Sequence, residues 1–475
     1  MCTQKNRSVR LGTIIMVCLL AGCTVFVPPK RQDPVEKLPQ NYNLFTPSHP
    51  PSKSTWWEHF ENPELNQLMA EAMGQNFSIR QAKARLNQAI AITRKVGADR
   101  WPQLDYEAEV SVGRSRAEDV SGRSLSTGER SFEEYSLGLS AGYEIDLWGR
   151  ISSQQQATLL DESAAKEDFY AAAMTIAGEV AQCWIDIITQ RMEQKILAKQ
   201  LETNQTLQEL VDLRFQKGMV SALDVYQQKQ ALAGVKASLP LVQLQEIQLT
   251  HKLAYLLGQS AESELNIQTK ELPKIKTLPA IGIPVNLLAN RPDIRAAGLR
   301  LRSADWAVSA AKADRLPALR LTARATYLSE DFSSLFDNWI LNLMNSLTGP
   351  IFDGHSRKAE VLRTQAVAKE LIAAYGDVVY LAIKEVEDLL AQEEKHRQHL
   401  AALKQQLEVS QNALKEAGER YTSGLNDYLP VLTQLLSNQS LERDILQMKR
   451  QLISDRIGLF RAIGGSWPKE ILNPD

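Results

Sequence analysis

The chain has 475 residues, of which 44% are hydrophobic, a combination typical of a folded protein large enough for two or three domains. Basic and acidic residues nearly balance, at 54 against 56. The molecule as a whole therefore presents no net field to attract nucleic acid or an anionic bilayer. Bulk disorder and nucleic-acid binding are excluded as first hypotheses.

The first 22 residues have the pattern of an export signal. Lys5, Arg7 and Arg10 precede an apolar run of about ten residues, whereas a membrane-spanning helix needs roughly twenty. The run ends in Leu20, Ala21, Gly22 and Cys23, which resembles the lipobox of bacterial lipoproteins. We predict a signal peptide over residues 1–22 and a mature N-terminus at a lipid-modified Cys23, whose acyl chains would anchor the protein stably.

A polar, proline-rich leader follows over residues 23–55, and a folded body begins near Trp56. Cys2 and Cys18 leave with the signal and Cys23 is lipidated, so Cys183 remains without a cysteine partner. Because Cys183 lies in an apolar helical stretch, we predict that it is a small core residue rather than a nucleophile.

Two very long helices are predicted from the spacing of prolines, because a proline inside a helix costs about 3 kcal/mol. No proline occurs between Pro102 and Pro240, or between Pro350 and Pro430. Apolar residues recur at steps of three and four within both gaps. Helices over 151–217 and 356–423 would each reach about 100 Å at 1.5 Å per residue, and rods of this length indicate coiled-coil packing.

Four strands are predicted where the hydrophobic period changes to two, over 103–113, 134–147, 318–328 and 338–351. Their polar positions carry charges, among them Asp105, Glu107 and Glu109 in the first strand and Arg320 and Arg324 in the third. Each strand is about ten residues, enough to cross a bilayer when tilted. A soluble sheet is the alternative. Four strands leave two unpaired edges and a bacterial barrel needs about eight, so a membrane sheet requires an oligomer.

The chain also contains an internal duplication. Ala98 to Pro102 recurs as Ala313 to Pro317, 215 residues later, and Arg214 recurs as Arg420, 206 residues later. The change of offset indicates a deletion of nine residues in the second copy, which we place in a surface loop. The predicted organisation is a first repeat over 56–270 with a helical hairpin at 150–258, a linker over 271–284, a second repeat over 285–465 with a hairpin at 356–463, and a tail over 466–475.

These motifs together resemble the outer-membrane factor family, in particular the TolC-like OprM and NodT-type lipoproteins that serve RND-type efflux pumps. The resemblance covers essentially the whole chain. Besides the lipobox, it rests on Trp56-Trp57, on the segment Tyr143 to Arg150, on Arg291 to Ile294, and on Gly349 to Gly354.

The resemblance implies a mixed α and β membrane protein: a homotrimer in which three sets of four strands form a twelve-stranded β-barrel and the long coiled-coil helices form a periplasmic α-barrel. It also implies that the two hairpin tips contact a periplasmic membrane-fusion adaptor, which links the duct to an inner-membrane RND-type transporter. The predicted tip residues are Gly218, Met219, Val220, Ser221, Gly424, Leu425 and Asn426.

The sequence departs from the family pattern near the second tip. Many relatives have an aspartate where this chain has Thr433, and Pro430 stands where the first copy has Asp224. An acidic constriction at this hairpin is therefore in doubt, and Asp224, Asp427 and Tyr421 are the residues that could still form one.

No motif for catalysis is present. Glu393 and His396 form a single Glu-x-x-His pattern, whereas a di-iron site in a bundle needs two plus further glutamates, so we predict that His396 and His399 lie on a solvated helix face. We predict no catalytic residue, no metal site and no cofactor beyond the lipid on Cys23.

The predicted function is a passive duct for drugs or other small solutes from the periplasm to the exterior, lipid-anchored in the outer membrane. Two alternatives remain open, a duct for type I protein secretion and a periplasmic scaffold lipoprotein without a pore.

Overall fold

The computed structural model describes residues 26–28, 39, 42, 55–117, 128–275, 278 and 284–465. Cys23 and the predicted signal peptide and tail lie outside these residues. The described elements, in chain order, are η1 (Trp56–Phe60), α2 (Pro63–Gln75), α3 (Phe77–Ala98), β1 (Gln103–Ala117), β2 (Gly128–Ile145), α4 (Arg150–Gln216), α5 (Ala222–Leu256), α6 (Pro284–Asn290), α7 (Pro292–Ala313), β3 (Ala318–Ser329), η2 (Phe332–Ser334), β4 (Trp339–Thr348), α8 (Ser356–Thr422) and α9 (Leu429–Ala462).

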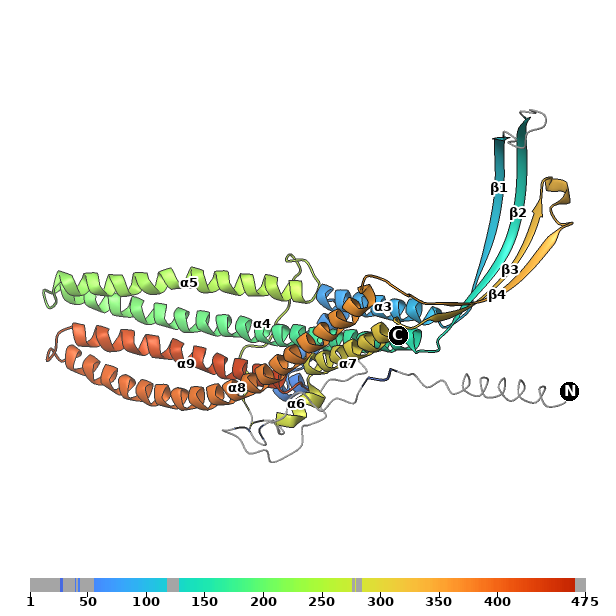
Figure 1. Cartoon of the computed structure of the whole chain (residues 1–475). Coiled ribbons are helices and arrows are strands. Elements are labelled where there is room, and N and C mark those ends of the chain that lie inside the picture. Colours follow the sequence, from blue (N-terminus) through green and yellow to red (C-terminus); the bar gives the residue numbers. More distant parts are fainter. Residues whose placement is uncertain are drawn as a thin grey trace. The chain divides into compact units, whose positions relative to one another are not determined.

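The order of elements repeats, as the duplication predicts. In both halves a helix leads into two paired strands and then into a helical hairpin (Figure 1). The repeats are not separate compact bodies, because each of the two compact units of the chain contains segments of both repeats. Unit 1 comprises 1–34, 87–164 and 297–375, and unit 2 comprises 35–86, 165–296 and 376–475.

Unit 1 contains one antiparallel sheet with the strand order β1-β2-β3-β4. Its strands run for 15, 18, 12 and 10 residues, and the two hairpins curve together over their length (Figure 1). β2 pairs with β3 from Tyr135 opposite Ser329 to Ile145 opposite Leu319, which joins the two repeats in the middle of the sheet. β1 and β4 are the two edges.

The predicted strand ends need correction. β1 continues beyond its predicted end at residue 113, and β2 begins before its predicted start at residue 134, because backbone pairing continues from Gly113 opposite Phe132 to Ala117 opposite Gly128. β4 ends at Thr348, before Gly349 and Pro350, because proline has no N–H to offer the ladder. The deletion therefore shortens the strands of the second repeat, which have 12 and 10 residues against 15 and 18 in the first.

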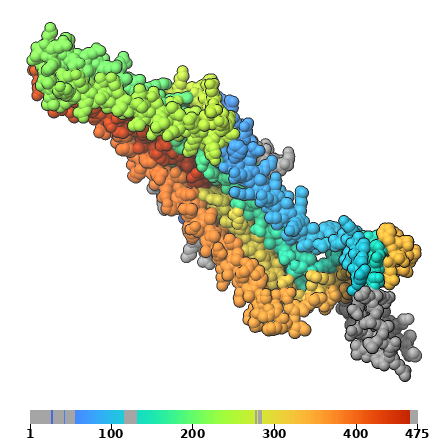
Figure 2. Space-filling view, turned by 90° about the horizontal axis from the view of Figure 1, so that it is seen from above, coloured from blue at the N-terminus to red at the C-terminus, as the bar shows by residue number. Residues whose placement is uncertain are grey.

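Unit 2 contains most of the two helical hairpins, α4 from residue 165 onwards with α5 and α8 from residue 376 onwards with α9. These parts of the hairpins run alongside one another (Figures 1 and 2). α4 and α8 each have 67 residues and end within one residue of the predicted positions. α5 continues through Pro240, so a proline did not interrupt this helix. α4 has a stretch long and apolar enough to cross a membrane, but 67% of it is buried, as in the core helix of a bundle.

The largest core of unit 2 lies where η1 and α2 pack on α4 and α9. Trp56 stacks on Phe460 with ring centroids 5.8 Å apart, and Trp57 meets Trp56 edge-on at 5.7 Å. The Trp184 Nε1–H donates to Glu64 Oε1 at 2.7 Å. The double tryptophan at the start of the body is thus a packing element. Cys183 belongs to the same cluster and is 1% exposed, which confirms its prediction as a core residue.

Candidate functional site

The sheet has one apolar and one polar face, as its alternating sequence predicts. On the apolar face the large side chains of both edge strands are exposed, Tyr106 at 82% and Leu343 at 79%. Exposed apolar surface of this extent is typical of a membrane or protein interface. In the described chain neither β1 nor β4 has a strand on its outer side, so the sheet is also open at both edges.

The polar face contains ion pairs that reach across strands. Arg324 of β3 pairs with Glu107 of β1, although β2 lies between them. The register explains the reach: Glu107 lies opposite Gly138, and Arg324 lies opposite Ser140. Because these residues of β2 are small, the arginine side chain can extend over them to the glutamate.

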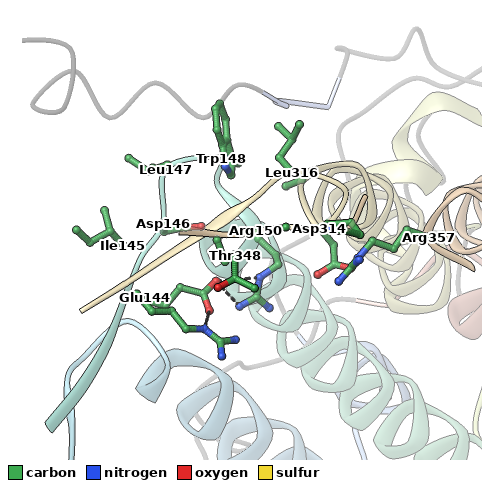
Figure 3. A pocket seen from close by; sticks show the side chains of 15 residues that line it. Glu144, Ile145, Asp146, Leu147, Trp148, Arg150, Asp314, Leu316, Thr348 and Arg357 are labelled. Atoms are coloured by element: carbon green, nitrogen blue, oxygen red, sulfur yellow. Dashed lines mark hydrogen bonds and ion pairs between the residues drawn. The ribbon is translucent and has the colours of Figure 1, made fainter. Parts of the chain in front are cut away.

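A pocket of about 430 Å³ lies at the end of the sheet, where strands change into helices (Figure 3). Glu144 of β2 is its central acid. Arg150 donates to Glu144 Oε1 from Nη2 at 2.7 Å and from Nε at 3.2 Å. Arg320 of β3 donates to Glu144 Oε2 at 3.3 Å. One carboxylate therefore joins β2, β3 and the first turn of α4.

The same junction fixes the start of α4. Asp146 accepts the N–H groups of Ile151 and Ser152 at 3.0 and 2.8 Å, which satisfies two free donors of the first turn. The Trp148 Nε1–H donates to the Pro317 carbonyl at 2.7 Å. The segment Tyr143 to Arg150, one of the motifs shared with the family, is thus the connector between sheet and helix, a role that the sequence pattern did not reveal.

Each predicted hairpin tip turns at a glycine with positive φ, Gly218 at 69° and Gly424 at 73°. Beyond them, Met219 N–H bonds the Arg214 carbonyl at 2.9 Å, and Leu425 N–H bonds the Arg420 carbonyl at 2.8 Å. This is the hydrogen bond that ends a helix on a left-handed glycine. The repeated sequence therefore produces the same turn twice.

The tips present apolar side chains to solvent. Met219 and Leu223 are 63% and 64% exposed at the first tip, and Leu425 is 71% exposed at the second. Ser221 closes the first turn by forming a reciprocal capping box with Asp224 at the start of α5. The start of α9 has no side-chain cap, so the two tips differ.

The three predicted constriction residues do not form one exposed group. Asp224 is half-buried, and its Oδ2 accepts the Ser221 N–H and hydroxyl, each at 2.9 Å. Asp427 is exposed. Tyr421 is 3% exposed, with its ring 5.4 Å from that of Tyr428. The suggestion that Tyr421 faces a constriction needs correction, because its ring packs in the core of the hairpin ends.

Two polar contacts that the sequence did not indicate join the hairpins near their tips. Arg214 of α4 donates to the carbonyls of Tyr421 and Thr422, both at 2.9 Å. Tyr428 donates its hydroxyl to Gln228 Oε1 of α5 at 2.5 Å, and Gln228 Nε2 donates to the Asn204 carbonyl at 2.8 Å. Arg214 and Tyr421 are 207 residues apart and Gln228 and Tyr428 are 200 apart, so no local pattern links the two hairpins.

Further along, apolar side chains fill the inside of each hairpin. Leu197, Val235 and Val242 cluster between α4 and α5, and a second cluster, of Leu403, Leu441 and Ile445, lies between α8 and α9. α4 and α9 belong to different hairpins, and besides their apolar contacts in the core around Trp184 and Phe460 they are joined by polar side chains. One ion pair joins Asp186 to Arg450, and hydrogen bonds join Gln182 to Ser454, Glu193 to Gln447 and Gln200 to the Gln439 carbonyl.

The predicted solvated histidine face is wrong in part. Glu393 is 2% exposed and pairs with Arg456 at 2.5 Å. His396 Nδ1 lies 2.6 Å from the buried Asp455 Oδ2, while His399 is exposed. In the described part of the chain no group of three or more His, Cys, Asp or Glu side chains could hold a metal ion.

A two-faced antiparallel sheet joined to paired coiled-coil hairpins defines the TolC-like class of outer-membrane ducts. The family model for "Outer membrane efflux protein" matches residues 68–259 and 283–465. The chain therefore belongs to this family and is an outer-membrane efflux channel, which confirms the resemblance read from its motifs.

Relatives and solved structures agree. The pyoverdine export outer membrane protein OpmQ of Pseudomonas putida is 31% identical over 420 residues, which cover 87% of this chain and 88% of that protein. The probable outer membrane lipoprotein SilC of Salmonella typhimurium is 26% identical over a match that covers 96% of this chain and 99% of that protein. The solved structure of the outer-membrane channel OprN is 28% identical and has a TM-score of 0.85, over a match that covers 93% of this chain and 99% of that one.

Proposed function

We propose that this chain forms, as a homotrimer, the duct of a tripartite system that exports small solutes from the periplasm to the exterior. The observation that carries the proposal is the sheet with two unpaired edges and faces of opposite polarity. Backbone groups cannot stay unpaired in hydrocarbon, and four strands are half of what the smallest bacterial barrels use. Three copies joined edge to edge give twelve strands, with the polar face turned inward.

The exposed tips support a contact with a periplasmic adaptor. The apolar side chains of Met219, Leu223 and Leu425 are exposed at turns held by backbone hydrogen bonds, and exposed apolar side chains that gather in one place mark protein interfaces. We propose that the adaptor connects the duct to an inner-membrane RND-type transporter that supplies the energy. The duct itself would be passive and perform no catalysis.

The anchor is proposed to be lipid on Cys23. The lipobox supports it, as does the similarity to a relative named as an outer membrane lipoprotein. Cys23→Ser should lose metabolic labelling by radioactive palmitate. Labelling that persists in this variant would exclude Cys23 as the site of the lipid.

Efflux is tested by the accumulation of a fluorescent dye, such as ethidium, in cells with and without the gene. Loss of the gene should raise accumulation, and the intact gene should restore it. Unchanged accumulation of dyes together with loss of a secreted protein would favour type I secretion. A folded protein without strands in the membrane would favour the scaffold alternative.

Docking is tested by Leu425→Asp, with Leu436→Asp on α9 as the matched control. Leu436 is 45% exposed but lies away from the tip. The tip variant should lose efflux while still assembling in the membrane, and the control should retain efflux. Equal activity of the two variants would exclude adaptor contact by Leu425.

A further inference from the structure

The two repeats meet in the middle of the sheet, where β2 ends beside the start of β3. The last residue of β2, Ile145, lies opposite Leu319. Beyond this pair, Trp148 donates its Nε1–H to the Pro317 carbonyl at 2.7 Å, and Leu316 lines the same pocket as Trp148 (Figure 3). All five residues are half-buried. The residues that follow β2 and those that precede β3 therefore form a covered contact, the internal junction.

The duplication relates this junction to the open edges of the sheet. β1 pairs with β2 from Gln103 opposite Gly142. β3 pairs with β4 from Ala318 opposite Thr348, which is the same pair displaced by 215 residues in one strand and 206 in the other. These are the two offsets of the duplicated sequence, so the offsets hold within the sheet.

The turns that lead into the long helices are equivalent as well. Gly149 before α4 and His355 before α8 are 206 residues apart, and both have positive φ, at 75° and 67°. The residues that follow β4 and those that precede β1 are thus the two halves of a second junction. A single chain cannot close it, because β4 and β1 are opposite edges of its sheet.

The two junctions exchange a large side chain. At the internal junction Trp148 lies after β2 and Leu316 lies before β3. The offsets give Gly354 after β4 as the counterpart of the tryptophan, and Trp101 before β1 as the counterpart of the leucine. Each junction therefore has one tryptophan, on opposite sides of the contact.

The two halves of the second junction are uncovered in the single chain. Trp101 is 72% exposed, and Ile351 and Phe352, next to the turn of Gly354, are 105% and 84% exposed. A Cβ added at Gly354 would meet no atom within 4 Å, so the space beside this glycine is open. Large apolar side chains exposed together mark an interface, and their counterparts are half-buried where a partner is present.

We infer that successive copies of the chain join at this second junction, where Trp101 of one copy fills the open space beside Gly354 of the next. The inference rests on the proposed function, in which a second copy is the partner of each open edge. Continuity with the internal junction supports this partner, because one contact of the same design already joins β2 to β3 within each chain.

The same offsets specify how the edge strands pair. Leu137 lies opposite Tyr327 within the chain, which becomes Leu343 of one copy opposite Val112 of the next. Both side chains lie on the apolar face and are exposed, at 79% and 70%. A slip of one residue would bring apolar side chains of one strand against the polar face of the other. The register thus keeps the two faces of the sheet continuous across copies.

Disulfide cross-linking of the full-length protein in outer membranes tests the register. With Leu343→Cys and Val112→Cys in one chain, oxidation by copper phenanthroline should produce a covalent trimer on a denaturing gel without reductant, because directly opposite residues are within disulfide reach. Leu343→Cys with Ala108→Cys is the matched control. It is four residues out of register, about 13 Å along the strand, and should remain a single chain.

The role of the tryptophan is tested by Trp101→Leu, which should lower the temperature at which the detergent-extracted trimer dissociates on a gel. Trp339→Leu is the matched control, because Trp339 is 67% exposed at the opposite end of β4. The control should keep the wild-type temperature. Aromatic side chains also bind the membrane surface, and equal shifts in the two variants would assign Trp101 to lipid and overturn the inference.

The remaining outcomes separate the junction from the duct. A trimer in which Trp101→Leu has the wild-type dissociation temperature would overturn the junction. A trimer that cross-links through the control pair, or not through Leu343 and Val112, would overturn the register on which the junction is built. In both cases the duct would stand. A wild type that is monomeric in the membrane would overturn the proposed function and this inference with it.

Discussion

Replacing Tyr428 with phenylalanine should loosen the contact between the two hairpins near their tips. The change removes the hydroxyl that donates to Gln228 Oε1, in a site where Tyr428 and Gln228 are 1% and 0% exposed. Leaving a buried acceptor without a donor costs about 1–3 kcal/mol. Since 1.4 kcal/mol is tenfold in an equilibrium constant, local opening should become roughly five- to 150-fold more frequent.

The assay is hydrogen–deuterium exchange read by mass spectrometry in peptides from the tip-proximal parts of α5 and α9, where local opening governs exchange. Gln228→Leu combined with Tyr428→Phe should recover only part of the protection, because it removes the unpaired acceptor of Gln228 but also the Nε2 donor of the buried Asn204. Unchanged exchange in Tyr428→Phe, or additive losses in the double variant, would show that the bond between Tyr428 and Gln228 does not hold the tips together.

The same bond predicts a pH dependence. Burial raises the pKa of the Tyr428 phenol above its ordinary value, and Tyr421 and Asp224 act in the same direction. The folded state therefore holds the proton more tightly than the unfolded state. The protonated phenol therefore stabilises the folded state fully below a pH of about 10, which is the pKa of the phenol in the unfolded chain. This stabilisation is lost as the pH rises through the higher pKa of the folded state. Tyr428→Phe should flatten this alkaline loss of protection in the tip peptides.

Three further predictions concern the helical unit. Gly258→Ala should destabilise the protein by about 2–4 kcal/mol, whereas Gly218→Ala should destabilise it by about 1–2 kcal/mol. Both glycines have positive φ, but only at position 258 would a Cβ overlap the last carbonyl of α2. Equal denaturation midpoints of the two variants would contradict this prediction. Burial raises the pKa of Cys183 to about 12, so iodoacetamide at neutral pH should label it in denaturant but hardly in the native protein, and rapid native labelling would contradict its burial. Arg456→Met should lower the free energy of unfolding by about 3 kcal/mol, because the buried charge of Glu393 loses a partner. Glu393→Gln in the same chain should restore most of this stability. If Arg456→Met has the stability of the wild type, the ion pair does not stabilise the protein.

Periodicity predicted the long elements well because it persists over many turns. The helix expected over 151–217 runs from Arg150 to Gln216, and the one expected over 356–423 ends at Thr422. The tip glycines were also predictable, since a repeated glycine after a long apolar stripe indicates a left-handed helix end. Both turn with positive φ.

Contacts between distant segments were not predictable. Arg214 repeats as Arg420 in sequence, but Arg214 bonds two carbonyls of the other hairpin, whereas Arg420 pairs within its own helix with Glu416. Tyr421 lies close to the second tip in sequence and was predicted to face a constriction, yet its side chain is buried. Equivalent positions of a duplicated chain therefore have different surroundings, which a pattern along one copy cannot distinguish.

Three sheets must close into one cylinder if the chain forms a duct, and the mass of the intact assembly shows whether they do. Native mass spectrometry of the detergent-extracted protein should give three times the mass of the lipidated mature chain, in a form whose migration on a gel changes on heating. A monomer of single-chain mass, without heat-modifiable migration, would exclude the trimeric duct, because the unpaired edges of β1 and β4 would then have no partner in the membrane.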